Sequence, residues 1–182
     1  MNTKTKYLLL SASSASAAAA FSTSDIFLFS YFKIMETQIE ELTKIAVNEG
    51  GKPYTDSKVE VLRAINGVEI AAENIGELKG GEVPMGLTPA SEGRIAFTQR
   101  EPIGVVASVS AFNHPLNLIV HQVITAVAAG CPVIVKSHPM HAATGEMVSS
   151  AVIKAAEKTG MPNGVFSNLN SSGIEVGQAL VQ

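Results

Sequence analysis

Two polar side chains follow apolar runs that are typical of buried strands. Asn113 comes shortly after GVVASVS, and Lys136 closes PVIVK. An amide on such a turn can donate to a developing oxyanion, or it can cap the helix that follows. A lysine at the end of a buried strand can pair with a phosphate or donate to ribose hydroxyls, or its ammonium can extend from the sheet edge into water. The two residues by themselves leave these alternatives open.

The elements that must position these residues lie between Gly104 and Lys136. This run predicts a strand, a turn, an apolar helix and a second strand, with Pro115 able to begin the helix and Gly130 able to end it. Both strands carry apolar residues on both faces, as strands covered by helices do. A β-α-β unit has parallel strands, and ligands of open parallel sheets bind at the carboxyl ends of the strands. Asn113 and Lys136 should therefore lie at one edge.

Other segments extend this pattern in both directions. Helical periodicity begins at Met35 and returns after Asp56, an acceptable N-cap, where the expected buried stripe is Val61, Leu62, Ile65, Val68, Ala72 and Ile75. Glycines and prolines between 76 and 89 predict an irregular connection, followed by a short exposed strand in RIAFTQREP. A helix near 144–158, a third strand in GVFSNLN and a helix in SGIEVGQALVQ complete the chain. The predicted fold class is α/β, with N-terminal helices followed by the first part of a Rossmann-like parallel sheet.

Composition excludes several classes of function. A net charge of -3 with scattered Lys and Arg argues against a nucleic-acid partner. The sequence contains no run of 18 apolar residues, so a membrane span is not predicted. The one cysteine, Cys131, excludes an internal disulfide and lies at a helix-to-strand junction, where a small packed residue is expected rather than a nucleophile. The four histidines lack a CxxC pair or a carboxylate set nearby, so no metal site is predicted.

Four segments in order, EPIGVV, SAFNHPLN, AVAAGCPVIVK and GMPNGVFSNL, resemble the aldehyde dehydrogenase superfamily. NEGGKP at 48–53 matches more loosely, so the resemblance covers roughly 35–182. It implies NAD(P)-dependent oxidation of a small aldehyde to a carboxylic acid, through a cysteine thiolate and a general-base glutamate. Neither residue has a counterpart here, so the resemblance implies the N-terminal part of a longer homo-oligomeric enzyme, inactive as this chain alone. The alternative is a catalytically silent nucleotide-binding or subunit-interaction fragment, and a coding sequence that continues beyond Gln182 into a GQxC segment would favour the enzyme.

The same resemblance assigns roles to individual residues. Asn113 matches the asparagine that stabilises the oxyanion, and Lys136 matches the lysine that contacts the adenosine ribose. In the family, three positions form the wall of the cofactor cleft on the nicotinamide side. They match Val109, Ser110 and Phe112 in this chain, where Phe112 replaces the usual tryptophan. Gly177 matches a position close to the adenine, although tight helix packing is an alternative reason for this glycine.

The family's KPAE pattern is KSHP in this chain. Pro139, beside His138, stands where a glutamate would hold both ribose hydroxyls and repel a 2′-phosphate. NADP should therefore be accepted at least as well as NAD.

The first 34 residues differ in composition from the rest. Lys4 and Lys6 precede YLLLSASSASAAAAFS, which has the order of a secretory signal, although serines dilute its apolar part. Export or organelle targeting through residues 1–24, a poorly ordered leader and a packed N-terminal helix are the alternatives. We assign 1–34 as a leader or poorly ordered segment, 35–182 as a partial cofactor-binding domain, and the cytoplasm as the compartment, because exported proteins do not usually carry nicotinamide-binding domains.

Overall fold

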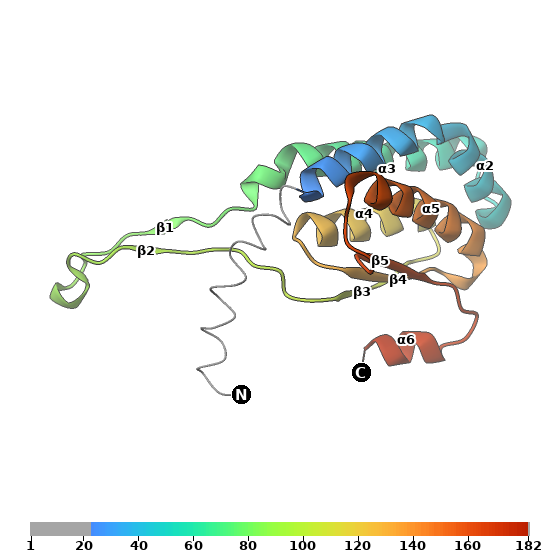
Figure 1. Ribbon diagram of the computed structural model, residues 1–182. Coiled ribbons are helices and arrows are strands. Elements are labelled where there is room, and N and C mark those ends of the chain that lie inside the picture. Colours follow the sequence, from blue (N-terminus) through green and yellow to red (C-terminus); the bar gives the residue numbers. More distant parts are fainter. Residues whose placement is uncertain (1–22, 182) are drawn as a thin grey trace.

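The structure is a computed structural model that describes residues 23–181 (Figure 1). In chain order, after a helix described over 23–37, the elements are α2 (Ile39–Gly50), α3 (Tyr54–Asn74), η1 (Ile75–Glu77), β1 (Glu82–Val83), η2 (Pro89–Ser91), β2 (Ala96–Phe97), β3 (Val106–Val109), α4 (Pro115–Ala128), β4 (Val133–Lys136), η3 (Pro139–His141), α5 (Ala142–Thr159), β5 (Phe166–Leu169) and α6 (Glu175–Leu180). The α/β fold class is confirmed.

A parallel three-stranded sheet forms the base of the fold. Its strand order is β3-β4-β5, and both pairs are parallel, as the β-α-β pattern predicts. Helices α4 and α5 contact the strands, and α2 and α3 pack on those two helices, so the helices form two layers over one face of the sheet (Figure 1). The predicted helix limits at Pro115 and Gly130 are confirmed, with Gly130 in the left-handed region at φ 74°.

The second face of the sheet is more open than the sequence predicts. Val105 and Val109 are 64% and 55% exposed, although covering helices were expected on both sides. Within the described residues, α6 lies on this side of the sheet, near the C-terminus (Figure 1). One short helix is too small to cover it.

Helix α3 also departs from the prediction in two details. It begins at Tyr54 after Pro53, so Asp56 lies within its first turn rather than at the N-cap. Leu62 is 45% exposed, whereas Val61, Ile65, Val68 and Ala72 are buried as expected. Successive residues of a helix are rotated by about 100° about its axis. Leu62 therefore points away from the face of α3 that carries Val61 and packs on α4.

The prediction of a leader or poorly ordered segment over residues 1–34 is wrong for residues 23–34. Residues 23–37 form a helix whose buried face consists of Phe27, Leu28, Tyr31, Phe32 and Met35. Ser24 Oγ donates a 2.9 Å hydrogen bond to the carbonyl of Val127 at the end of α4. Residues 23–34 therefore belong to the packed domain, because their aromatic stripe completes its core. The targeting prediction for 1–24 falls almost wholly outside the described residues.

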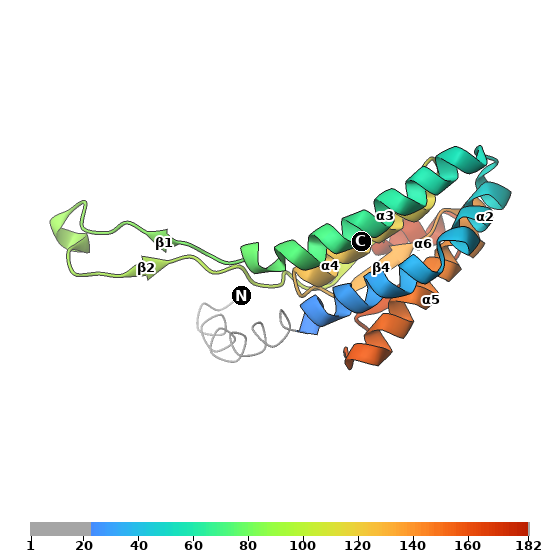
Figure 2. The same cartoon turned by 90° about the horizontal axis from the view of Figure 1, so that it is seen from above.

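An antiparallel arm leaves the body between η1 and β3 (Figures 1 and 2). Glu82 pairs with Phe97 and Val83 with Ala96, which confirms a short exposed strand in this segment. In residues 23–181, no helix combines the length and the apolar character that a membrane crossing requires.

Candidate functional site

The carboxyl ends of the three parallel strands meet at one edge of the sheet. The register pairs Val109 with Lys136 and Lys136 with Leu169. The turns after β3 and β4 carry Asn113 and His138, and α6 follows β5. The edge predicted from the sequence is therefore present, and it gathers residues from three separate segments.

Lys136 is buried rather than extended into water. Only 7% of the residue is exposed, and its Nζ donates to the carbonyls of Ser137 and Ser171 at 3.4 Å each. A Cβ at Gly177 would lie 3.8 Å from Lys136 Cδ, so α6 passes over the lysine stem. An ammonium has three N–H donors, and two long hydrogen bonds leave capacity for a further acceptor. The arrangement fits a ligand with hydroxyl or phosphate oxygens.

An aromatic cluster lies beside this lysine's strand. The Phe112 ring centroid is 5.3 Å from that of His138 and 5.0 Å from that of His141. Phe112 remains 45% exposed, so part of its ring is available to a ligand. His138 caps η3, accepting a 3.2 Å hydrogen bond at Nδ1 from the N–H of Met140, and Pro139 is exposed next to it.

His141 was not singled out from the sequence as a site residue, and it is completely buried. Burial lowers the pKa of His141 below its ordinary 6.5, outweighing the opposite effect of the Glu49 carboxylate. The imidazole is therefore neutral at neutral pH. Its i,i+3 spacing from His138 was the one available signal, but spacing does not reveal burial.

Ser110 and Val109 have different surroundings although they are adjacent. Ser110 is buried, its N–H donates to the Lys136 carbonyl at 3.0 Å, and its Oγ donates to the Pro115 carbonyl at 3.3 Å. Val109 is half-exposed on the open face of the sheet. Ser110 thus joins β3 to β4 and to the helix start, whereas Val109 offers apolar surface.

Asn113 is exposed on the turn before α4 and does not cap that helix. The N-cap position belongs to His114, and the first-turn amides of Leu116 and Asn117 donate instead to Glu60 Oε1, at 3.0 and 3.1 Å. The capping alternative for Asn113 is therefore wrong. Its carbonyl accepts a 3.2 Å hydrogen bond from Lys52 Nζ.

A second carboxylate from the N-terminal helices caps α5. Glu49 accepts hydrogen bonds from the N–H groups of Ala143 at 2.8 Å and Thr144 at 2.6 Å, and from Thr144 Oγ1 at 2.6 Å. The sequence reasoning missed Glu49, Lys52 and Glu60. The loose match at NEGGKP contains two of them and was the available signal.

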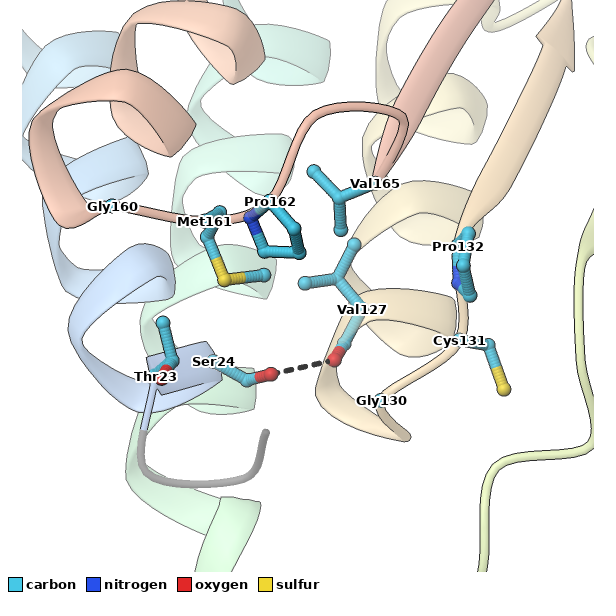
Figure 3. A pocket seen from close by; sticks show the side chains of 10 residues that line it. All are labelled: Thr23, Ser24, Val127, Gly130, Cys131, Pro132, Gly160, Met161, Pro162 and Val165. Atoms are coloured by element: carbon cyan, nitrogen blue, oxygen red, sulfur yellow. Dashed lines mark hydrogen bonds between the residues drawn. The ribbon is translucent and has the colours of Figure 1, made fainter. Parts of the chain in front are cut away.

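A separate pocket lies at the opposite, amino-terminal edge of the sheet (Figure 3). It encloses about 350 Å³ and is lined by Thr23, Ser24, Val127, Gly130, Cys131, Pro132, Gly160, Met161, Pro162 and Val165. Cys131 is 3% exposed, which confirms a packed residue. Residues 23–181 contain no group of three or more His, Cys, Asp or Glu side chains placed to hold a metal ion.

The chain is similar in sequence to known dehydrogenases. It is 36% identical to a 3-sulfolactaldehyde dehydrogenase of Priestia aryabhattai over 146 residues, which cover 79% of this chain and 29% of that protein. Identity to a lactaldehyde dehydrogenase of Methanocaldococcus jannaschii is 34% over 156 residues, covering 85% and 32%. The chain thus spans about a third of the length of these relatives.

Solved structures show the same architecture. Aldehyde dehydrogenase 21 from Physcomitrella patens, in complex with the reaction product succinate, superposes with a TM-score of 0.80 at 29% identity, covering 89% of this chain and 34% of that one. A glyceraldehyde-3-phosphate dehydrogenase from Methanocaldococcus jannaschii complexed with NADP gives 0.76 at 28% identity, covering 88% and 37%. The model of the aldehyde dehydrogenase family matches residues 11–182. With its parallel sheet and the turns at its carboxyl edge, this chain belongs to the aldehyde dehydrogenase family.

Proposed function

We propose that the carboxyl edge of the sheet is part of the cofactor site of an NAD(P)-dependent aldehyde dehydrogenase. The observation that carries this proposal is Lys136, a buried cation with spare donor capacity at the strand edge where such folds bind ligands. The bound cofactor would supply the hydride acceptor for oxidation of an aldehyde to a carboxylic acid.

Each residue at the edge has a physical reason for its proposed role. Lys136 would donate to ribose hydroxyls or pair with a phosphate. Val109 and Phe112, both about half-exposed, would give the nicotinamide an apolar wall. Asn113 would donate its side-chain amide to the oxyanion of the substrate, a contribution of about 3 kcal/mol in enzymes that use such a donor.

The relatives support a proposal for the substrate, and the cofactor supports one for the compartment. Two curated relatives are named for 3-sulfolactaldehyde and lactaldehyde, and one solved structure holds succinate. We therefore infer a small aldehyde as substrate of the complete enzyme, working in the cytoplasm.

Self-association is part of the same proposal. The arm and the open sheet face expose large apolar side chains, among them Leu87, Ile95, Phe97, Ile103 and Val105. Apolar surface of this kind marks contact sites. We infer a homo-oligomer, and sedimentation velocity showing a monomer at micromolar concentration would contradict it.

Cofactor binding tests the proposal directly. Calorimetric titration of the 182-residue chain with NAD⁺ and NADP⁺ should show binding, and Lys136→Met should weaken it at least about tenfold, or about 1.4 kcal/mol. Methionine retains the stem that packs under α6 but removes the ammonium. The matched control is Lys154→Met, an exposed lysine on α5, which should leave binding unchanged. Equal effects of the two variants, or absence of binding to the parent, would refute the site.

A catalytically silent fragment is the second candidate. It would bind the cofactor through the same residues, and the coding sequence downstream of Gln182 separates the two. The open sheet face is the observation that favours it, because such a surface suits subunit contact.

A further inference from the structure

We infer that Glu60 and Lys52 are positioning residues that hold Asn113 in place for its role in the reaction, an inference that rests on the proposed function. Neither residue belongs to the parallel sheet or to the turns that follow its strands. Both act from the N-terminal helical layer, through hydrogen bonds and charge that reach the turn before α4.

Glu60 is a buried carboxylate with its acceptor capacity in use. Its side chain is 1% exposed. One oxygen accepts the N–H groups of Leu116 and Asn117, and the other pairs with the Lys52 ammonium and lies 3.5 Å from His114 Nδ1. A carboxylate removed from water requires such partners, and the amides at the start of a helix carry the positive end of its dipole. These contacts fix the helix start against α3.

Lys52 connects this carboxylate to the main chain of Asn113. Its Nζ pairs with Glu60, donates to the Asn113 carbonyl at 3.2 Å and lies 3.2 Å from His114 Nδ1. The three partners surround one ammonium, so the peptide after Asn113 cannot rotate without breaking a charge-assisted hydrogen bond.

The side chain of Asn113 itself makes no hydrogen bond to any residue in 23–181. The backbone that carries it therefore fixes only the point and the direction in which the Cα–Cβ bond leaves the chain. A donor that stabilises an oxyanion must be aimed before the reaction begins, and displacement by about 1 Å is costly. The Lys52 and Glu60 pair holds the stretch of backbone from which this amide must reach the oxyanion.

Glu49 offers an internal comparison. It caps α5 as Glu60 caps α4, but its three hydrogen bonds all end on the first turn of α5, and no hydrogen bond among residues 23–181 joins it to Asn113. A variant of Glu49 should therefore disturb a helix start without disturbing Asn113.

The test uses the 182-residue chain labelled with ¹⁵N. Glu60→Gln and Lys52→Met should each shift the backbone and side-chain amide resonances of Asn113 and lower its order parameters. Exchange of the Leu116 and Asn117 amides should accelerate at least about tenfold in Glu60→Gln. Glu49→Gln should accelerate exchange at Ala143 and Thr144 and leave Asn113 as in the parent. Lys52→Arg retains a cation within reach of both partners and should restore the parent behaviour.

Two outcomes would overturn the inference. One is that the amide resonances and order parameters of Asn113 are the same in Lys52→Met as in the parent. Glu60 would then be only a structural cap of α4. The other is an equal disturbance of Asn113 by Glu49→Gln. If Glu60→Gln does not fold, Lys52→Met decides, because Lys52 is partly exposed and its loss leaves Glu60 bound to two amides. The proposed function has a separate readout, since failure of Lys136→Met to weaken cofactor binding would refute the cofactor site and leave the Asn113 measurement standing.

Discussion

The backbone N–H of Leu116, in the first turn of α4, donates a 3.0 Å hydrogen bond to the carboxylate of Glu60, which lies 56 positions earlier on α3. The helix that begins at the candidate site is thus capped from a remote helix rather than by its own turn. Helix α5 is capped in the same way by Glu49. The N-terminal helices therefore fix both turns that reach the carboxyl edge of the sheet.

Glu49→Ala should lower the free energy of unfolding by about 1–3 kcal/mol, because two backbone amides and a hydroxyl at the start of α5 lose their acceptor. Urea denaturation followed by circular dichroism measures the change. Glu41→Ala, at an exposed position on the same helix, is the control and should stay within about 0.5 kcal/mol. Equal losses in the two variants would contradict the cap.

Gly177→Ala should leave stability within about 0.5 kcal/mol but weaken cofactor binding. The added Cβ would meet the nearest atom, Lys136 Cδ, at 3.8 Å, which is an ordinary contact. Helix packing therefore does not require glycine here, whereas close approach of a ligand would. Thermal unfolding and calorimetric titration together check both parts, and a destabilised variant would favour the packing explanation.

Pro139→Glu should shift the preference from NADP toward NAD by at least about tenfold, or 1.4 kcal/mol. A carboxylate near the ribose repels a 2′-phosphate, and Pro139 is exposed, so the substitution should be tolerated by the fold. The ratio of dissociation constants for the two cofactors, in parent and variant, measures the shift. A parent specific for NAD, or an unchanged ratio, would place Pro139 away from the ribose.

The stability of the chain should fall as the pH drops below about 6.5, and His141 should account for part of this fall. Burial lowers the pKa of His141, so between that lowered value and 6.5 the unfolded chain binds more protons than the folded one. The contribution of His141 to the free energy of unfolding is therefore fully present above pH 6.5 and is lost as the pH falls toward the lowered pKa. The titratable groups facing this imidazole are Glu49 on α2, Glu60 on α3 and His138, which precedes η3.

His141→Leu should therefore flatten the dependence of unfolding free energy on pH between 7.5 and 5.5. His121→Leu, an exposed histidine on α4, is the control and should retain the slope of the parent. Parallel curves for the parent and His141→Leu would show that this imidazole is not responsible.

The 182-residue chain should show no aldehyde-dependent reduction of NAD⁺ or NADP⁺. Its one thiol, Cys131, is buried at the amino-terminal edge of the sheet, opposite Lys136. Spectrophotometry at the absorbance maximum of the reduced cofactor measures turnover, with Cys131→Ala as a companion variant. Activity in the parent that disappears in Cys131→Ala would overturn the structural role of this residue.

The sequence by itself determined the order and type of the α-helices and of the strands of the parallel sheet from residue 39 onward. The apolar strands around Val106 and Val133, the helix between Pro115 and Gly130 and the parallel pairing all follow from local patterns, because residue period and turn chemistry act over a few neighbours. These patterns also located Asn113 and Lys136 at one edge. The placement of Lys136 under Gly177 needed the tertiary structure, since two segments had to meet there.

Tertiary structure alone decided which polar groups are buried and what satisfies them. The sequence groups residues 23–34 with the leader because helical periodicity first becomes apparent at Met35, yet Phe27 and Tyr31 are buried once the core is assembled. The caps from Glu49 and Glu60 join positions far apart in the chain, and no local pattern encodes a partner at that distance. A carboxylate on a helix is compatible with solvent or with a helix start, and only the packing of α2 and α3 on α4 and α5 distinguishes the two.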